Sequence, residues 1–329
     1  MHPESLLMDA PLYALSPEHL AFGGERTLGF FEGHGGAQLR YALFRPEQKT
    51  PRGTIVIVQG RNECIEKYLE TIRDLTTAGF VVATFDLRGQ ALSGRLGKNP
   101  RTGHVEHFQD YLTDIDRFLS VIIEPVAPQP IHILAHSLGG LIALSLAPQL
   151  GARVSRMVLS APLVGLSGLP VSPRLAFSVA AFFSTFGMGE RPLGKERGTM
   201  PFDGNPLTSC PTRFGNLSRL RETHSDLGIG PPTARWLNEV RKAMARVLQP
   251  DHLTQITVPT LILAPVQDGV VPFSAMEGLA RRFRAGRLVP ISGARHELLM
   301  EQDRYRAQAL AAILAFLPEP AEPLEAGTV

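Results

Sequence analysis

The stretch Ile131–Leu144, with the sequence IHILAHSLGGLIAL, contains the pattern that decides the fold. An apolar run comes first, and an apolar pattern with helical spacing follows it. Ser137 lies between the two, and the small residues Ala135 and Gly139 stand two positions before and after it. A serine at a sharp turn from a buried strand into a helix is typical of a nucleophile elbow. The small neighbours let strand and helix pass closely, and the turn lifts the hydroxyl clear of the sheet.

Leu138 is expected to open the helix that follows this turn. Its backbone N–H then points toward whatever Ser137 attacks, which suits the binding of an oxyanion. The alternative interpretation is an ordinary strand-to-helix turn in which Ser137 only caps the helix. The five-residue pattern alone is weak, because Gly and Ser are common residues. The strand before it, the helix after it and the partner residues described below favour a nucleophile.

The composition indicates a globular protein with a substantial core. The chain has 329 residues, 44% of them hydrophobic, which is enough for one large domain or two small ones. A net charge of +2, without a long run of Lys or Arg, argues against nucleic acid as a partner. Cys64 and Cys210 lie far apart in the sequence, so they form no disulfide framework and favour a reducing compartment.

No segment is typical of a secretory signal or a membrane span. The first five residues, Met1–Ser5, lack a basic region, and no apolar region follows them. No uninterrupted apolar stretch approaches the length of about 18 residues that a spanning helix needs. We therefore expect a cytoplasmic protein. Peripheral contact with the inner face of the membrane is an alternative that the sequence leaves open.

Strand and helix patterns alternate on both sides of a central interruption. Short β-branched runs such as Thr54–Val58 suit parallel strands that are covered on both faces. The alternation predicts an α/β fold with a mostly parallel central sheet and helices on both faces. The expected elements are a hairpin over 27–45, strands over 54–58, 81–85, 131–134, 154–159, 260–264 and 287–291, and helices over 65–78, 107–123, 273–283 and 301–316.

The interruption, residues 164–247, is expected to form an inserted helical cap. Ligands of open α/β sheets bind beyond the carboxyl ends of the strands, and this insertion leaves the sheet there. Its apolar run 175–183 has helical spacing and could line an acyl pocket, pack against the main domain or contact a membrane surface. The expected domains are an N-terminal extension over 1–26, a core over 27–163 and 248–316, the cap over 164–247 and a disordered tail over 317–329.

A nucleophilic serine needs a base, and the base needs an orienting acid. In the predicted architecture the acid follows a late strand and the histidine follows the last one. Asp268 comes directly after the strand 260–264, and His296 comes after the strand 287–291. Asp251 precedes its strand and is therefore a poorer candidate. The alternative interpretations are that Asp268 is an ordinary turn residue before glycine and that His296 is a surface histidine. Both are less favoured, because each residue follows the strand after which the acid or the histidine is expected.

A second oxyanion donor is expected in the loop after an early strand. Gly60 permits a close turn there, and Arg61 would supply its backbone N–H beside that of Leu138. The Arg61 side chain is in addition a candidate contact to a phosphate or glycerol group. His104 and His107 fit no helical zinc motif, so no metal site is predicted.

Taken together, these residues resemble the α/β-hydrolase superfamily and, more narrowly, the bacterial lysophospholipase and monoacylglycerol lipase group. The similarity covers residues 27–316. Three positions depart from the pattern, with Gln59 in place of His and with Ala91 and Ala135 in place of Gly, but none removes a reacting atom. The matching pieces are 60–61 with 66–68, 86–90, 103–105 with 108 and 110–111, 135–140, 205–209 with 213, 230–233 with 236, and 293–297.

The resemblance implies a serine carboxylester hydrolase that cleaves a lipid-like monoacyl ester, a lysophospholipid or a monoacylglycerol, without a cofactor. Ser137 would carry the acyl group, His296 would move the proton and Asp268 would orient His296. The N–H groups of Arg61 and Leu138 would hold the oxyanion. A thioesterase or acyltransferase with the same triad is an alternative. A non-catalytic binding protein of the same fold is a second alternative, against which the intact triad argues.

Overall fold

The central sheet collects strands from most of the chain. The computed structural model describes residues 10–14, 23–194 and 200–318, so the expected N-terminal extension lies partly, and the expected tail mostly, outside the described residues. The strands are β1 (Arg26–Glu32), β2 (Gln38–Phe44), β3 (Thr54–Val58), β4 (Val81–Phe85), β5 (Ile131–His136), β6 (Arg156–Ser160), β7 (Thr260–Pro265) and β8 (Gly286–Ile291). They form one sheet in the order β1-β2-β4-β3-β5-β6-β7-β8. The pairs β1–β2 and β2–β4 are antiparallel, and the other pairs are parallel.

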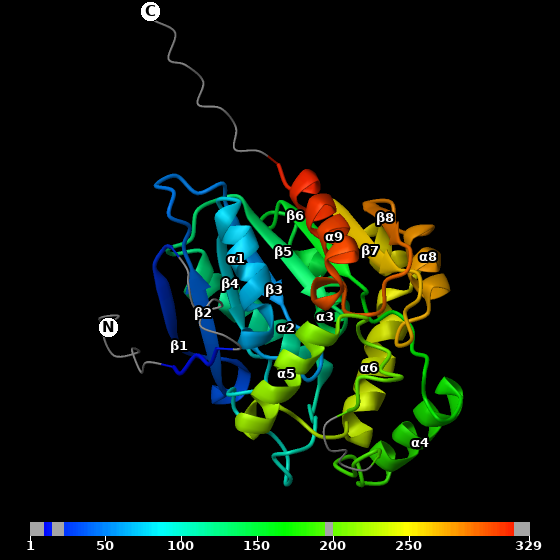
Figure 1. Cartoon of the computed structure of the whole chain (residues 1–329). Helices are drawn as coiled ribbons and strands as arrows, with labels where there is room; N and C mark the ends of the chain where they lie inside the picture. The colour runs from blue at the N-terminus through cyan, green and yellow to red at the C-terminus, as the bar shows by residue number, and fades with distance from the viewer. Residues whose placement is uncertain (1–9, 15–22, 195–199, 319–329) are drawn as a thin grey trace, which may run out of the picture.

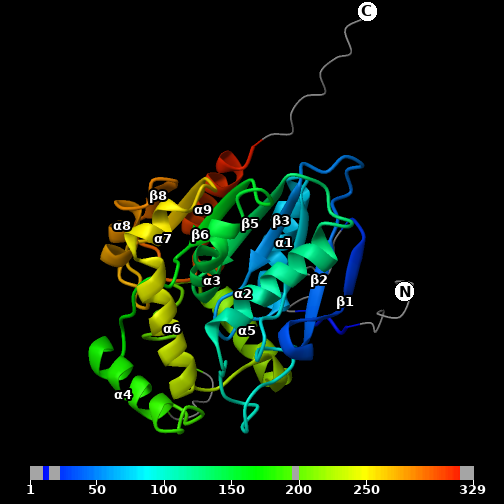
Figure 2. The same cartoon turned by 180° about the vertical axis from the view of Figure 1, so that it is seen from behind.

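Helices cover both faces of this sheet. They are η3 (His34–Gly36), η4 (Ile65–Tyr68), α1 (Leu69–Thr77), α2 (Phe108–Arg117), η5 (Phe118–Ile123), α3 (Leu138–Leu146), η6 (Ala147–Gln149), α4 (Pro173–Thr185), α5 (Pro211–Thr223), η7 (Ser225–Leu227), α6 (Ala234–Val247), α7 (Pro250–Thr254), α8 (Phe273–Ala280), η8 (Leu298–Met300) and α9 (Asp303–Phe316). Figure 1 shows α1 and α9 on one face, and Figure 2 shows α2 on the opposite face. Apolar side chains of α1 and α9 belong to one buried cluster, and those of α2, α3 and α8 to another. The predicted α/β architecture is confirmed.

The parallel strands follow the apolar runs of the sequence with small shifts at their ends. Every residue of β3 is buried, because helices cover both faces of the sheet. The predicted strand 131–134 extends two residues further, since its ladder with β6 continues to the pair His136–Ser160. The predicted helix 301–316 begins two residues later, at Asp303, because the Glu301 carboxylate accepts the backbone N–H groups of Arg295 and Ser209.

In the order of the chain, helices α4, α5, α6 and α7 come between β6 and β7. The first three of them lie at one end of the sheet (Figure 1). The predicted apolar run 175–183 falls within α4, which packs against α6, and α6 packs in turn against α2 and α3. Helix α4 buries Ala180 and Ser184 but leaves Phe182 exposed, and Phe186, which directly follows the helix, is exposed as well. In the described part of the chain, no helix combines the length and the apolarity that crossing a bilayer requires.

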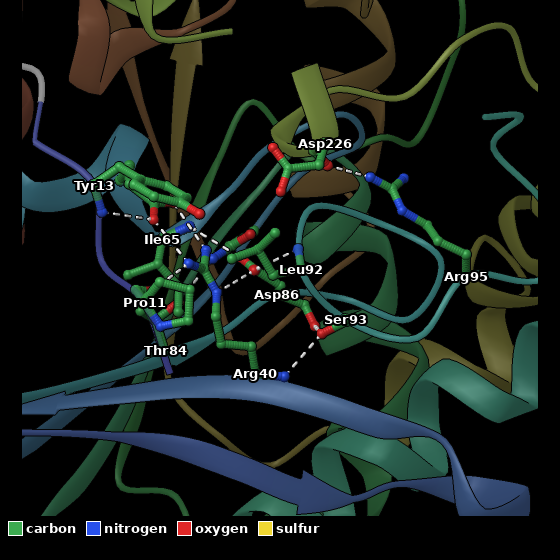
Figure 3. Close-up of polar contacts among 12 residues, drawn as sticks. Pro11, Tyr13, Arg40, Ile65, Thr84, Asp86, Leu92, Ser93, Arg95 and Asp226 are labelled. Carbon is green, nitrogen blue, oxygen red and sulfur yellow. Dashed lines mark hydrogen bonds and ion pairs between the residues drawn. The ribbon is translucent and has the colours of Figure 1, made fainter. Parts of the chain in front are cut away.

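A buried ion cluster joins the antiparallel edge of the sheet to the loops that precede the site (Figure 3). Arg40 on β2 donates to both carboxylate oxygens of Glu66, at 2.8 Å each, and to Asp86 at 2.7 Å. All three side chains are fully buried. Burial lowers the pKa of Arg40, but the two carboxylates outweigh it and hold the pKa above the ordinary value. Asp86 also accepts the backbone N–H of Ile65 at 3.0 Å, which fixes the start of η4.

Candidate active site

Ser137 occupies a strained turn between β5 and α3. Its φ of 50° and ψ of −113° lie in a region that residues other than glycine rarely adopt. The turn is held because the Ser137 N–H donates to the Ser160 carbonyl at 3.0 Å, and the Ser137 carbonyl accepts from the Leu163 N–H at 2.9 Å. A Cβ at Gly139 would lie 2.6 Å from the Gln59 carbonyl. Only glycine therefore lets α3 approach the end of β3 this closely.

The structure brings together the three side chains that the sequence predicted as a triad. His296 Nε2 lies 2.9 Å from Ser137 Oγ, and His296 Nδ1 lies 2.7 Å from Asp268 Oδ2. The other oxygen of Asp268 accepts the N–H groups of Val270 and Val271 at 2.7 and 2.9 Å. The Asp268 side chain is fully buried, and that of His296 is 4% exposed. This hydrogen-bonded chain orients the imidazole so that Nε2 can accept the serine proton.

The loop after β3 is held on both sides of Arg61. Gly60 donates its N–H to the Glu63 carboxylate, and its carbonyl accepts from Gln90 Nε2 at 3.1 Å. The Asn62 N–H donates to the Gln90 side-chain oxygen. The intervening N–H of Arg61 has no acceptor among the described residues. Polar contacts therefore fix the loop while one of its amides keeps its capacity to donate.

Leu138 carries the other N–H that the sequence predicts as an oxyanion donor. It is the first residue of α3 and directly follows Ser137. Since the first N–H groups of a helix have no intrahelical acceptor, the Leu138 N–H is available to a ligand of the serine. The positive end of the helix dipole lies at the same place and favours negative charge there.

Glu63 is a buried carboxylate beside the triad that the sequence did not single out. It accepts the Tyr68 hydroxyl at 2.6 Å and the Lys67 ammonium, and it lies 3.6 Å from His136 Nε2. Burial raises the pKa of Glu63, but the charge of Lys67 and the hydrogen bonds from Lys67 and Tyr68 lower it to about 2. The ionised carboxylate thus anchors both the Gly60 loop and the first turn after it. The four-residue spacing of Glu63 and Lys67 is a signal in the sequence that could have indicated this pair.

His136 lies between Glu63 and the triad histidine. Its ring centroid is 5.0 Å from that of His296, and its Nδ1 is 3.1 Å from the Ser160 carbonyl. Burial, opposed by Glu63, lowers the pKa of His136 to about 4, so the ring is neutral at pH 7. A second cation beside His296 is thereby avoided. A cavity of about 10 Å³, room for about one water molecule, lies here. It is lined by Lys67, Tyr68, His136, Glu297, Leu299 and Met300.

The histidine loop is bound to the inserted segment. Arg295 donates to the carbonyls of Asn205 and Thr208 at 2.9 and 3.1 Å. Glu301 accepts the Ser209 hydroxyl at 2.6 Å and the Arg295 N–H at 2.9 Å. Residues 205–209 and 293–297, two of the segments that carry the resemblance, therefore lie side by side although 83 residues separate them in the sequence.

The sheet is mostly parallel, and Ser137 lies at the sharp turn between β5 and α3. Asp268 and His296 follow β7 and β8 and are hydrogen-bonded to each other. This arrangement defines an α/β hydrolase. In sequence comparison, residues 49–303 match the family described as serine aminopeptidase, S33. The match covers more than half of the chain, so the chain belongs to this family, and it is a serine hydrolase.

Relatives of known name share the greater part of their length with the chain. The probable lysophospholipase L2 of Haemophilus influenzae is 30% identical over 304 residues, which cover 91% of this chain and 95% of the relative. Lysophospholipase L2 of Escherichia coli K12 is 32% identical over 308 residues, covering 90% and 88%. A soluble variant of Saccharomyces cerevisiae monoglyceride lipase, solved with a substrate analog, has a TM-score of 0.71 at 18% identity and coverage of 89% and 96%. The predicted resemblance to this group is confirmed, and the structural likeness shows the fold.

Proposed function

We propose that the protein hydrolyses the ester bond of a lipid-like monoacyl substrate, a lysophospholipid or a monoacylglycerol, through an acyl-enzyme on Ser137. The observation that carries the proposal is the unbroken chain of hydrogen bonds from Ser137 through His296 to Asp268, at 2.9 and 2.7 Å. The lysophospholipase names of the relatives support the phospholipid. The name of the structural neighbour supports the monoacylglycerol.

In the proposed reaction, Ser137 Oγ attacks the ester carbonyl carbon while His296 Nε2 takes the hydroxyl proton. The N–H groups of Arg61 and Leu138 stabilise the negative charge that develops on the carbonyl oxygen. His296 then gives the proton to the leaving glycerol oxygen, and the acyl group stays on Ser137. A water molecule, deprotonated by His296, releases the fatty acid by the same route. Asp268 holds Nδ1–H and stabilises the imidazolium in both steps.

The purified protein should release fatty acid from lysophosphatidylcholine and from a monoacylglycerol, and a fluorophosphonate should label it. Both results follow from an activated serine hydroxyl beside an oxyanion site. Fatty acid release by mass spectrometry, with an acyl-CoA of the same chain length as a comparison, separates ester from thioester hydrolysis. Transfer of the acyl group to an added alcohol in excess of hydrolysis would favour the acyltransferase. Absence of labelling and turnover would favour a binding protein.

We also propose that the exposed face of α4 contacts the lipid surface that holds the substrate. Eight of the ten large apolar side chains that are exposed in the described residues lie between 169 and 200. Phe182 and Phe186 are 55% and 64% exposed, and their ring centroids lie 4.6 Å apart. Such a concentration on α4 and the segments next to it marks an interaction surface.

Replacing both Phe182 and Phe186 with serine should weaken vesicle binding by about 10-fold or more, because each partly buried phenyl ring contributes on the order of 1 kcal/mol. Cosedimentation with phosphatidylglycerol–phosphatidylethanolamine vesicles measures the effect. Hydrolysis of a water-soluble p-nitrophenyl ester should persist. Val121→Ser, on an exposed apolar residue of η5 outside the insertion, is the matched control and should bind like wild type. Equal binding by the double variant would contradict the contact.

A further inference from the structure

The guanidinium of Arg61 lies between the core and the inserted segment without a carboxylate partner. Its Nη2 donates to the carbonyl of Gly230, and its Nε is buried without a hydrogen-bond partner. The guanidinium carbon is 5.3 Å from the ring centroid of Trp236 on α6. Burial lowers the pKa of Arg61 to about 10, which leaves it protonated at neutral pH. No ion pair joins Arg61 to any acidic side chain of the described residues.

Two other buried arginines are neutralised by carboxylates. Arg40 binds Glu66 and Asp86, and Arg88 donates to both oxygens of Asp114 at 2.5 and 2.6 Å. Such pairing is expected, because a buried charge without a counter-charge is costly. A cation that stays unpaired in the folded chain is therefore suited to an anion that arrives with a ligand.

Two further arginines border the same place. Arg221 on α5 donates to the Asn62 carbonyl, and its Nε is also buried without a hydrogen-bond partner. Arg95 donates to the carbonyls of Asp226 and Gly228. Backbone carbonyls carry only a partial negative charge, so these hydrogen bonds alone do not neutralise the three guanidinium groups.

The position of Arg61 in the chain places its guanidinium within one side-chain length of the reacting ester. Its backbone N–H is the proposed oxyanion donor, so its side chain begins next to the ester carbonyl. A Cβ at Gly103 would lie 2.8 Å from Arg61 Nη2 and 3.2 Å from Nε. The bare backbone of Gly103 therefore provides the room in which the guanidinium lies. In a lysophospholipid, only the glycerol unit separates the ester from the phosphate, a separation that one arginine side chain can span.

We infer that the Arg61 guanidinium binds the phosphate of the head group and makes the enzyme prefer lysophospholipids to monoacylglycerols. Guanidinium groups match phosphate oxygens with paired, charge-assisted hydrogen bonds. Nε already lacks an acceptor, and Nη2 can exchange a backbone carbonyl for an anionic oxygen. The inference rests on the proposed ester hydrolysis, to which it adds the group that determines head-group specificity.

The test compares kcat/KM for lysophosphatidylcholine and for a monoacylglycerol with the same acyl chain. In Arg61→Met the preference for the phospholipid should fall about 10- to 100-fold, the range expected for hydrogen bonds to a charged group. Arg61→Lys, which keeps the charge but not the paired geometry, should lie between wild type and Arg61→Met. Arg241→Met on α6 is the matched control, because it removes an arginine of the same insertion whose hydrogen bonds go to the Asn238 side chain, and it should leave the ratio within about two-fold.

An equal loss on both lipids in Arg61→Met would overturn the inference, because it would mean that the side chain only supports the loop or the cap. A wild-type enzyme that cleaves both lipids while the ratio stays unchanged in Arg61→Met would overturn the inference alone. A wild-type enzyme that cleaves neither lipid would overturn the proposed ester hydrolysis as well.

Competition separates a lipid head group from free phosphate. Glycerophosphocholine should inhibit monoacylglycerol hydrolysis competitively in wild type, and its inhibition constant should rise about 10-fold or more in Arg61→Met. Inorganic phosphate at the same concentrations should inhibit much less, because it lacks the glycerol unit. Equal inhibition by both compounds would assign Arg61 to free phosphate and overturn the head-group role.

Discussion

Replacement of Ser137 with alanine should lower kcat for monoacyl esters by about 10⁴- to 10⁶-fold. The substitution removes the oxygen that forms the acyl-enzyme and leaves only the oxyanion donors and substrate binding. The free energy of unfolding should change by less than about 1 kcal/mol, because alanine at φ 50° retains the strain of the turn. Fatty acid release under saturating substrate measures the first effect, and urea denaturation measures the second.

Ser145→Ala on the same helix is the matched control. Its hydroxyl donates to the Leu141 carbonyl at 2.8 Å and takes no part in the proposed chemistry. The variant should retain wild-type turnover and fluorophosphonate labelling. If Ser137→Ala folds and still turns over within about ten-fold of wild type, Ser137 is not the nucleophile.

Replacement of Arg40 with methionine should lower the free energy of unfolding by about 3–5 kcal/mol at pH 7. Glu66 and Asp86 would remain fully buried without their shared cation, and neither could reach water in the folded chain. Urea denaturation followed by circular dichroism measures the loss. Arg45→Met, a few residues further along the chain, removes an arginine whose contact is a long 3.4 Å hydrogen bond at the surface. That variant should change stability by no more than about 0.5 kcal/mol.

The destabilisation by Arg40→Met should depend on pH. Burial already raises the pKa of Asp86 against the opposing charge of Arg40, and loss of the arginine removes that opposition. A carboxyl group whose pKa is higher in the folded chain binds protons more tightly there than when unfolded. Its stabilising effect is present at low pH and is lost as pH rises through the unfolded and then the folded pKa. The deficit of the variant should therefore be smaller at pH 5 than at pH 8, and an equal deficit at both would contradict this account.

The sheet and the triad could be predicted because their signals are local or follow from chain order. The run Thr54–Val58 is apolar throughout, as a doubly covered strand requires. Asp268 and His296 were identified by their places after late strands, which the order of the chain reveals without coordinates. Physical constraints that act within one element or at its end are visible in the sequence.

The surroundings of the triad could not be predicted because they depend on contacts between distant segments. Gln90 fixes the Gly60 loop from 30 residues away, and nothing next to it in the sequence indicates that role. Ala91 adopts a φ of 42°, a conformation that favours glycine, so tertiary contacts override the local preference. The starts of two helices of the insertion do have local signals in the sequence, since Pro173 and Pro211 occupy the first turns of α4 and α5.

The strained conformation of Ser137 lowers the stability of the fold, whereas the proposed catalysis requires a serine at this turn. A non-glycine residue in this conformation costs on the order of 1–3 kcal/mol, which glycine would largely relieve. A laboratory selection for thermostability alone should therefore enrich Gly at this position and yield variants that are more stable but inactive. Evolving a hardier catalyst from this chain requires that survival be tied to turnover in every round.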